Sequence, residues 1–600
     1  MKKKIVIITI FILVLITLSL YYTYATDVSM DSSTGEVDLT YNIDIKDTSG
    51  RNITVKAGST KTFDIFITNN NGGTINYGLA YSPTKEDGIT IAQVNTSKNK
   101  VSELIENNTT HQISLIIINN TSNDVTYSII PITGYEKGGD LIVPDGYTLI
   151  TDIYGYPIDK SGANFPKLTN GLIPVVYDET KSSWVKADIT SSTSTYGWYD
   201  YNNKKWANAV LVTNTNRSTY QSASNGTEIP EEEILAYYVW IPRYKYKVWN
   251  ITKTYGTDSY NARTTGIDII FERGTNSTGT ITCNDYSFAA PTADTPNQTC
   301  SGTNNEYYTH PAFTFGDTEV EGIWVGKFEL SSSNPTAEYG GGTSTTLTVR
   351  IKPSINSWRN NPVSYYSAVI QNMQASSNEY GLTTDKTKAD SHMLKNMEWG
   401  AVAYFTNSNY GRCSGGTCTE VAINSYNSYK TGCGPQSAGS TSSGSTCNAY
   451  ATELGQTAST TGNVYGIYDM SGGAWEYVMG NSSSGSGSYT YSAGSAGSNF
   501  TYSAETAKYL DTYAYGDSYT DPKAYNRARL GDATGENVLS TGGSGGWYND
   551  YAYFVGLSRP WFIRGGYYNV GSYAGVFGFY GNLGAAISDY SSRACLIPLQ

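Results

Sequence analysis

Short stretches of alternating apolar and polar residues, each closed by a cluster of Asn and Gly, set the strongest limit on the fold of this chain. Residues 60–68 read TKTFDIFIT, so Phe63, Ile65 and Ile67 share one face of an extended strand, and NNNGG follows. Alternation with a period of two that ends in an Asn- and Gly-rich turn is typical of a β-hairpin. Long helical periodicities are scarce. The sequence therefore predicts a mainly β protein with minor α.

The alternating pattern returns over residues 112–118 and 124–130, which flank another Asn-rich turn. Strands repeated at such short spacing are typical of an immunoglobulin-like β-sandwich, which we predict over residues 27–142. Residues 143–164 follow as a linker. The expected role of the sandwich is a stalk that holds the C-terminal part away from a surface, and a second binding module is the alternative.

The N-terminus begins Met-Lys-Lys-Lys and continues with an uncharged run over residues 5–22. A basic start followed by an apolar stretch is typical of an export signal, and the run is also nearly long enough to span a bilayer. Residues 1–25 are therefore predicted to be a cleaved signal peptide or a retained membrane anchor. Both alternatives place the rest of the chain outside the cell or at its surface.

Seven cysteines would then lie in an oxidising compartment, where disulfides form. Six cysteines allow 15 pairings, so pairing between sequence neighbours is a hypothesis. It joins Cys283 with Cys300, Cys413 with Cys418, and Cys433 with Cys447. Cys595 is then left unpaired. Neither Cys-x-x-Cys spacing nor clustered histidines occur, so no metal site of the zinc type is predicted.

The formal net charge of −12 excludes the basic footprint of a nucleic-acid-binding protein. Acidic clusters at residues 517–521 and 532–536 offer oxygen atoms that would suit calcium, with exposed turn acids as the alternative reading. No other cofactor is predicted.

Residues 165–310 form a Tyr- and Trp-rich region followed by a Thr- and Asn-rich inserted loop. Trp184 and Trp206 recur at the same distance from a preceding Tyr-Asp pair, which favours packing across hairpins, with sugar stacking as the alternative. From the sequence, this region is either a subdomain of its own or the first layer of the domain that follows over residues 311–600.

The C-terminal segment, residues 564–595, is almost uncharged and rich in Gly, Tyr, Ser and Asn. Tyr supplies rigid amphipathic contact area, and Ser and Asn supply adaptable hydrogen bonds, as in antibody binding loops. The segment is therefore predicted to form a binding surface. A terminal β-hairpin without a ligand is the alternative.

Four segments carry a resemblance to a known family. They are GIWVGKFE at residues 322–329, MEWGAVA at 397–403, GNVYGIYDMSGGAWEY at 462–477, and the run RGG with AGVF at 564–577 before a closing Ser-x-Arg. Taken in this order, they resemble formylglycine-generating-enzyme-like (sulfatase-modifying-factor) domains, which have a C-type-lectin-like α+β fold. They are more similar still to the variable proteins of diversity-generating retroelements, which use that fold as a binding scaffold.

The resemblance implies a division of the domain into a structural frame and a binding face. The expected frame residues are Trp399, Trp475, Glu476, Arg564, Gly565, Gly566, Phe577 and Arg593. The expected ligand-binding residues are Tyr567, Tyr568, Asn569, Val570, Ser572, Tyr573, Gly578, Tyr580, Asn582, Leu583, Ala586, Ser588, Asp589 and Tyr590.

The same resemblance argues against catalysis. The family's oxidase uses a pair of cysteines, and the matching positions here are Val570 and Gly575. Neither side chain can replace a thiolate, and Cys595 alone does not restore the pair. The protein is therefore expected to be a surface receptor or adhesin that binds an unknown protein or glycan. It is not expected to be an enzyme. An inert structural surface protein whose lectin-like domain serves assembly is the alternative.

Overall fold

The computed structural model describes residues 40–44, 51–57, 59–70, 73–94, 103–119, 121–134, 141–151, 153–154, 159, 161–189, 191–251, 265–284, 298–343, 345–482, 506–514, 522–539, 545–556 and 558–599. These residues belong to one compact unit, Asp38–Gln600. The predicted signal peptide or anchor, residues 1–25, lies outside them. Within the described ranges, no helix is both long and apolar enough to cross a membrane.

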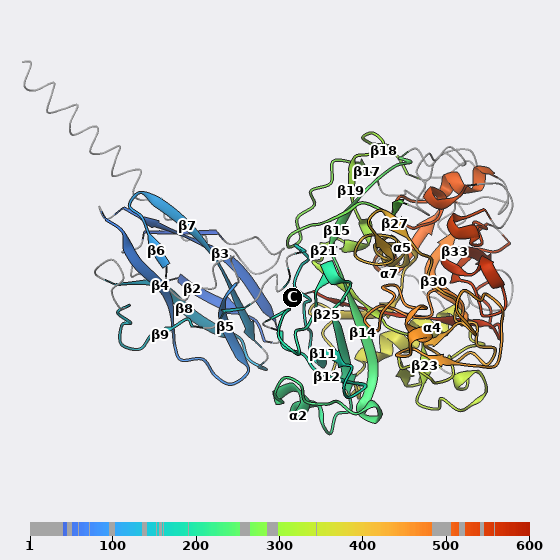
Figure 1. Cartoon of the computed structure of the whole chain (residues 1–600), viewed down its shortest axis with the longest axis horizontal. Coiled ribbons are helices and arrows are strands. Elements are labelled where there is room, and N and C mark those ends of the chain that lie inside the picture. Colours follow the sequence, from blue (N-terminus) through green and yellow to red (C-terminus); the bar gives the residue numbers. More distant parts are fainter. Residues whose placement is uncertain are drawn as a thin grey trace, which may run out of the picture. The chain divides into compact units, whose positions relative to one another are not determined.

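Two five-stranded sheets make up the N-terminal part, drawn in blue in Figure 1. The first sheet has the order β1 (Thr40–Asp44), β3 (Thr60–Asn69), β7 (Thr109–Asn119), β5 (Ile89–Val94) and β10 (Ile153–Tyr154). The second has the order β2 (Arg51–Val55), β8 (Val125–Gly134), β4 (Ile75–Ser82) and β6 (Glu103–Ile105), with β9 (Thr148–Leu149) paired to β4.

The two N-terminal sheets share one hydrophobic core. Phe63, Ile65 and Ile67 of β3 are all buried in it, as the alternating pattern predicts. Leu115, directly opposite Phe63 on β7, and Ile129 of the second sheet lie in the same core. Period-two alternation is therefore the local cause of this part of the fold, because it gives each strand one apolar face.

A seven-stranded antiparallel sheet organises the larger part of the chain. Its order is β12 (Ser183–Lys186), β11 (Leu172–Asp178), β13 (Asn208–Val212), β14 (Ile234–Pro242), β22 (Gly322–Gly326), β35 (Ala594–Pro598) and β25 (Ala389–Met393). Strands from residues 172–242 therefore lie in the same sheet as the last strand of the chain.

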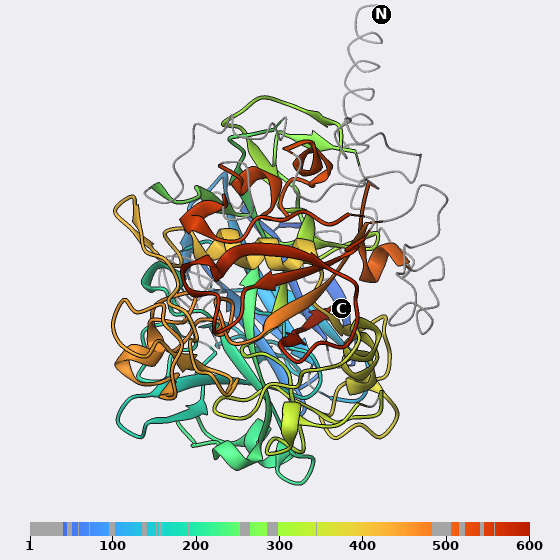
Figure 2. The same ribbon diagram turned by 90° about the vertical axis from the view of Figure 1, so that its right-hand side faces the viewer.

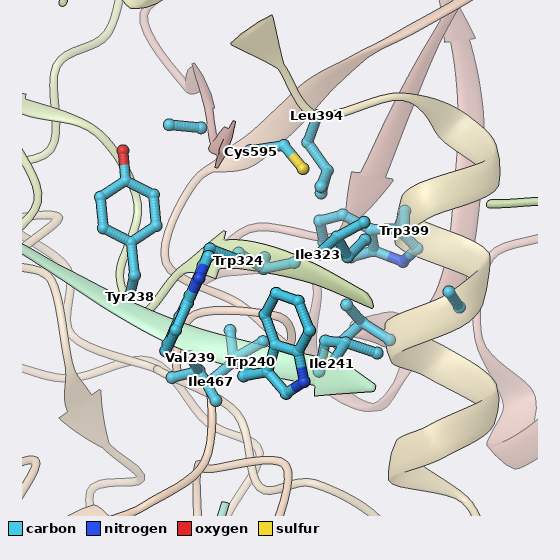
Figure 3. Close-up of a cluster of buried hydrophobic side chains, with 14 of the residues drawn as sticks. Tyr238, Val239, Trp240, Ile241, Ile323, Trp324, Leu394, Trp399, Ile467 and Cys595 are labelled. Atoms are coloured by element: carbon cyan, nitrogen blue, oxygen red, sulfur yellow. The ribbon is translucent and has the colours of Figure 1, made fainter. Parts of the chain in front are cut away.

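Tryptophan side chains fill the core beside this sheet. Trp240 and Trp324 are directly opposite each other on β14 and β22, with ring centroids 5.2 Å apart (Figure 3). Trp184 packs on its cross-strand partner Tyr177 in the β11–β12 hairpin, as predicted. Trp206 lies outside any hairpin and stacks on Phe405 instead. Because Trp184 and Trp206 are both buried, the sugar-stacking hypothesis for them is wrong.

Another five-stranded sheet contains three strands that include parts of the C-terminal segment. It has the order β31 (Asp511–Tyr513), β30 (Trp475–Ser482), β32 (Trp561–Gly565) and β33 (Gly575–Asn582), and β34 (Tyr590–Ser592) pairs with β30. Helix α5 (Asn396–Thr406) packs against β30 and β33, and Figure 2 shows it in yellow behind the red strands. A second helix, α4, spans Val363–Gln371.

The remaining elements are short. They are α2 (Arg217–Ser222), α6 (Glu453–Gln456), α7 (Thr506–Tyr509), the three-stranded sheet β16 (Ile269–Phe271), β15 (Tyr244–Lys247) and β19 (Tyr307–Thr309), and the strand pairs β20 (Thr314–Phe315) with β21 (Thr318–Glu319), β23 (Ser331–Ser332) with β24 (Val349–Arg350), β17 (Thr282–Cys283) with β18 (Cys300–Ser301), β26 (Cys413–Ser414) with β27 (Thr417–Cys418), and β28 (Cys433–Gly434) with β29 (Asn448–Ala449). The fold is thus mainly β with few helices.

Three disulfides lie in or beside the last three of these strand pairs. They join Cys283 with Cys300, Cys413 with Cys418, and Cys433 with Cys447, which confirms the pairing of sequence neighbours. Cys595 is free and buried on β35. Each bridge closes a short loop, so each limits the freedom of its own hairpin rather than joining distant parts of the chain.

The carboxyl group of Glu536 is buried in the core between α5 and β15. The hydroxyls of Tyr404 and Tyr246 donate hydrogen bonds to it, as does the backbone N–H of Gly531 at 2.9 Å. Burial disfavours the charged form and raises the pKa of Glu536 to about 7. The folded state therefore holds a proton on this group more tightly than the unfolded chain does, whose pKa is near the ordinary value of 4.5.

We expect the Glu536→Gln variant to gain stability relative to the native chain as the pH rises. Below pH 4.5 the carboxyl is protonated in both the folded and the unfolded state. Between pH 4.5 and 7 the folded state keeps this proton and the unfolded chain releases it, so the free energy of unfolding falls as the pH rises. The native chain should lose up to about 3 kcal/mol over this interval, and the glutamine variant should not. Urea unfolding of both proteins at pH 4.5 and pH 8 measures the difference. If the native chain and the glutamine variant differed in free energy of unfolding by the same amount at both pH values, the buried acid would not be the cause.

Candidate ligand-binding face

Two buried arginines hold the C-terminal segment in place. The Arg593 guanidinium pairs with the Glu476 carboxylate, with Nε donating to Oε2 at 3.0 Å, and it also donates to the carbonyls of Gly326 and Tyr468. These bonds join β30, β22 and the end of the chain. Removing either charge of such a pair would leave the other unpaired inside the protein, which is strongly destabilising.

Arg564 makes the second buried anchor. Its guanidinium donates to Asn396 Oδ1 at 2.7 Å, at the start of α5, and to the carbonyls of Gly578, Asp532 and Ala533. Burial lowers the pKa of Arg564 to about 10, which still leaves it charged at neutral pH. Arg564 therefore connects β32 and β33 to the start of α5.

Two further buried carboxyl groups, Glu329 and Asp469, lie near the Glu476–Arg593 pair. Burial, together with repulsion from Asp469 and Glu476, raises the pKa of Glu329 well above its ordinary value, and burial alone raises the pKa of Asp469 against the pull of Arg593. Burial also raises the pKa of Glu476 to about 7, although Arg593 opposes this. Burial in a medium of low dielectric constant therefore disfavours the charged form of each of these carboxyl groups, and Arg593 offsets part of that cost for Glu476 and Asp469.

The turn at Gly565 and Gly566 sends the chain from the frame to the surface. Their φ angles are +84° and +79°, a region open to glycine but costly for other residues. A Cβ atom on Gly566 would lie 2.7 Å from Cα of Ala574. Trp399 fixes the return of the chain, because its indole N–H donates to the carbonyl of Val576 at 2.8 Å. Residues 567–574 are thus a loop held at both ends by buried contacts.

All eight predicted frame residues are buried: Trp399, Trp475, Glu476, Arg564, Gly565, Gly566, Phe577 and Arg593. Of the predicted ligand-binding residues, six are exposed: Asn569, Ser572, Tyr573, Leu583, Ala586 and Ser588. Seven are half-buried: Tyr567, Tyr568, Val570, Tyr580, Asn582, Asp589 and Tyr590.

Gly578 is the exception, and its assignment to the binding face is corrected here. It lies on the same side of β33 as Tyr580 and Asn582, but it is buried. The backbone at Gly575 covers it, since a Cβ atom on Gly578 would lie 3.0 Å from the Gly575 carbonyl oxygen. The register shift between Arg564 and Gly565 brings the chain over this position.

Tyr590 and Asn582 also have roles inside the domain. The Tyr590 ring packs edge-on against Tyr477, with centroids 5.3 Å apart, and Asn582 joins the hydroxyls of both tyrosines through hydrogen bonds of 3.0 Å. Burial raises the pKa of Tyr590 to about 12. These two residues therefore contribute to packing as well as to the surface.

Two tyrosines that the sequence analysis missed complete the surface. Tyr551 lies 5.1 Å from Tyr573 between ring centroids, and Tyr553 lies 4.7 Å from Tyr580. Both are half-buried, while Ala552 between them and Phe554 after them are buried. The alternating pattern YAYF was the available signal, but it lies outside residues 564–595. Tyr551, Tyr553, Tyr567, Tyr573 and Tyr580 are called the tyrosine face below.

The tyrosine face rests on Trp475. The Trp475 ring is 6% exposed and lies 5.9 Å from the Tyr551 centroid and 6.2 Å from that of Tyr580. Arg559 covers part of Tyr580, with its guanidinium carbon 5.0 Å from the ring centroid. The face is therefore a set of aromatic rings held by aromatic neighbours, on the side of the sheet away from α5.

Segments from earlier in the chain form the rim of this surface. The Tyr429 hydroxyl donates to the Asp589 carboxylate, and the Tyr429 ring packs edge-on against Tyr568 at 4.8 Å. The Arg359 guanidinium carbon lies 3.6 Å from the centroid of the Tyr429 ring. Arg359 and Asp589, which carry opposite charges, thus both contact Tyr429.

The acidic cluster at residues 532–536 does not have the arrangement of a calcium site. Asp532 accepts hydrogen bonds from the backbone N–H groups of Arg529 and Thr534, and Glu536 points into the core toward Tyr404. The two carboxylates therefore serve separate local contacts. The other calcium hypothesis, at residues 517–521, lies outside the described residues.

No family model matches the chain, and no curated protein matches it. Among solved structures, the chain is similar to the pre-peptidase C-terminal domain of collagenase from Bacillus anthracis, with 11% sequence identity and a TM-score of 0.11. The similarity covers 16% of this chain and 99% of that chain. With so low a TM-score, it defines neither the fold nor the function of this protein.

The division between frame and surface predicts opposite effects for two aromatic truncations. Trp399→Ala should cost roughly 3–5 kcal/mol of stability, because it empties a fully buried site and frees the Val576 carbonyl. Tyr573→Ser should stay within about 0.5 kcal/mol, because the Tyr573 side chain is 37% exposed. Thermal unfolding of the two variants beside the native chain makes the comparison. An equal loss in both would show that the loop is part of the core.

Proposed function

We propose that this protein is a receptor or adhesin displayed outside the cell, which binds a protein or glycan ligand through the tyrosine face and the neighbouring exposed residues. In this proposal the C-terminal part is a C-type-lectin-like domain of the formylglycine-generating-enzyme type, used as in the variable proteins of diversity-generating retroelements. The N-terminal two-sheet part is an immunoglobulin-like stalk. The protein is not an enzyme in this proposal.

The observation that carries the proposal is the alternation of roles within one segment. Arg564, Phe577 and Arg593 are fully buried, whereas Asn569, Ser572 and Tyr573 between them are exposed. A loop whose two ends are locked in the core loses little further conformational entropy when it binds, so its contacts translate into affinity. Tyr, Asn and Ser on such a loop match the composition of antibody binding surfaces.

The near absence of free charge on the face favours a ligand recognised by shape, ring contacts and hydrogen bonds. Asp589 and Arg559 are both engaged with tyrosines. Tyrosine is enriched among the residues that dominate protein–protein binding energies, so a protein ligand fits the face, and sugar rings would also pack against exposed tyrosines. The alternative is a structural assembly domain. The partial burial of Tyr580 and Tyr590 favours it, because these rings also pack inside the domain.

The DNA around the gene tests the proposal against this alternative. A binding face that is diversified should be accompanied by a reverse transcriptase gene and by a near-copy of the codons for residues 564–595 that differs only at adenines. Sequencing many isolates should then show changes at Asn569, Ser572 and Tyr573 and none at Arg564 or Arg593. If none of the five codons varies among isolates and no near-copy is present, the inert structural protein is favoured.

Display outside the cell is a separate prediction, which rests on the three disulfides and the basic, apolar N-terminus. Protease added to intact cells that make the protein should release fragments of residues 311–600, detected by mass spectrometry. A cytoplasmic protein of the same cells serves as the control and should stay intact. Full protection of the C-terminal domain until the cells are lysed would refute display.

A further inference from the structure

Three residues with metal-binding side chains meet in the core, although Cys595 lies far from the other two in the sequence. Strands β25 and β35 are paired so that His392 lies directly opposite Cys595. Glu398 comes from the first turn of α5, which begins three residues after β25 ends. One nitrogen of His392, one oxygen of Glu398 and the sulfur of Cys595 all lie within 4.8 Å of one another.

Each of the three side chains is held by buried neighbours. His392 Nε2 lies 3.0 Å from Glu398 Oε1 and 3.3 Å from Oε2. The backbone N–H of Lys395 donates to Glu398 Oε2 at 2.8 Å, which fixes the carboxylate at the helix start. Figure 3 shows Cys595 at the edge of the buried cluster, next to Leu394. All three side chains are almost completely buried, and Cys595 forms no disulfide.

The other nitrogen of His392 faces a second carboxylate. His392 Nδ1 lies 3.4 Å from Asp390 Oδ1, and both of these buried atoms lack a hydrogen-bond partner among the described residues. Asp390 Oδ2 accepts from the Tyr509 hydroxyl at 2.7 Å and lies 3.1 Å from Lys508 Nζ. Phe315 stacks on the imidazole at 4.7 Å and fixes its plane. A carboxylate behind the imidazole is the usual outer partner of a histidine that binds zinc.

We propose that His392, Glu398 and Cys595 bind one zinc ion, with Asp390 orienting the imidazole. Nitrogen, carboxylate oxygen and thiolate are the three donor types that zinc accepts together, whereas calcium and magnesium take oxygen ligands. Binding replaces the proton on His392 Nε2 and the thiol proton of Cys595, so two protons leave as one ion with two positive charges enters. A buried His392–Glu398 ion pair without metal would explain two of the residues but gives the Cys595 thiol no part.

The ion would join three elements that support the tyrosine face. It ties the last strand, β35, to the edge strand β25 and to α5, and α5 packs against β30 and β33. Cysteine and histidine spacing in the sequence gave no sign of this site, because the ligands come from two strands paired across the sheet and from a helix start. The proposal is independent of what the tyrosine face binds.

Metal content of the full chain tests the proposal. Protein made in zinc-supplemented cells and purified without chelator should hold about one zinc ion per chain by elemental mass spectrometry, and Cys595→Ala and Glu398→Gln should hold less than about 0.1. Ser391→Ala is the matched control on β25, because its hydroxyl bonds to the Ile370 carbonyl rather than to the cluster, and it should keep the zinc.

Cobalt provides a readout that does not depend on whether the variants fold. The native chain, refolded with cobalt in place of zinc, should show the near-ultraviolet absorption of a cobalt–thiolate bond, since Cys595 is the one cysteine outside the disulfides. Zinc below about 0.1 per native chain, an absent thiolate band, or full zinc retention in Cys595→Ala would each overturn the proposal, and the buried ion pair would then be the correct account.

Discussion

The bond network of Arg593 is the interaction on which the C-terminal half of the structure depends. One guanidinium bonds to Glu476 on β30, to the Gly326 carbonyl on β22 and to the Tyr468 carbonyl. It thereby connects the five-stranded sheet that contains β30 to the seven-stranded sheet. Such a group is costly to desolvate, and its partners repay that cost only in one geometry. The two sheets therefore have one relative position in which Arg593 makes all of these bonds. The surface loops that follow these strands are fixed by the same arrangement.

The protein separates strong interactions from adaptable ones by side of the sheet. Charged groups with several partners, such as Arg564, lie toward α5, where water does not reach them. On the opposite side, tyrosines contact one another at the ring distances of ordinary aromatic pairs. Each of these contacts is weak by itself. Exchanging one surface side chain therefore leaves the arginine networks intact.

Sequence reasoning predicted what depends on local pattern and failed where register decides. Alternation over residues 60–68 was enough to predict the buried face of Phe63, Ile65 and Ile67, and spacing was enough for the three disulfides. The burial of Arg593 followed from a family resemblance, not from its own residue type. The burial of Gly578 depends on a register shift between strands, and the meeting of His392 with Cys595 depends on pairing across the sheet, so neither could be read from neighbouring residues.

The engagement of the rim charges has a consequence for the kinetics of association. Arg359 stacks on Tyr429, and Asp589 accepts from the same tyrosine, so little unbalanced charge projects from this surface. In the proposed receptor role, a ligand approaching the rim meets one positive and one negative group on the same tyrosine. For an uncharged ligand the association rate should fall in the range of unsteered encounters, roughly 10⁵–10⁶ M⁻¹ s⁻¹, and change little with ionic strength. Differences in affinity between ligands would then arise mainly from how long each complex lasts.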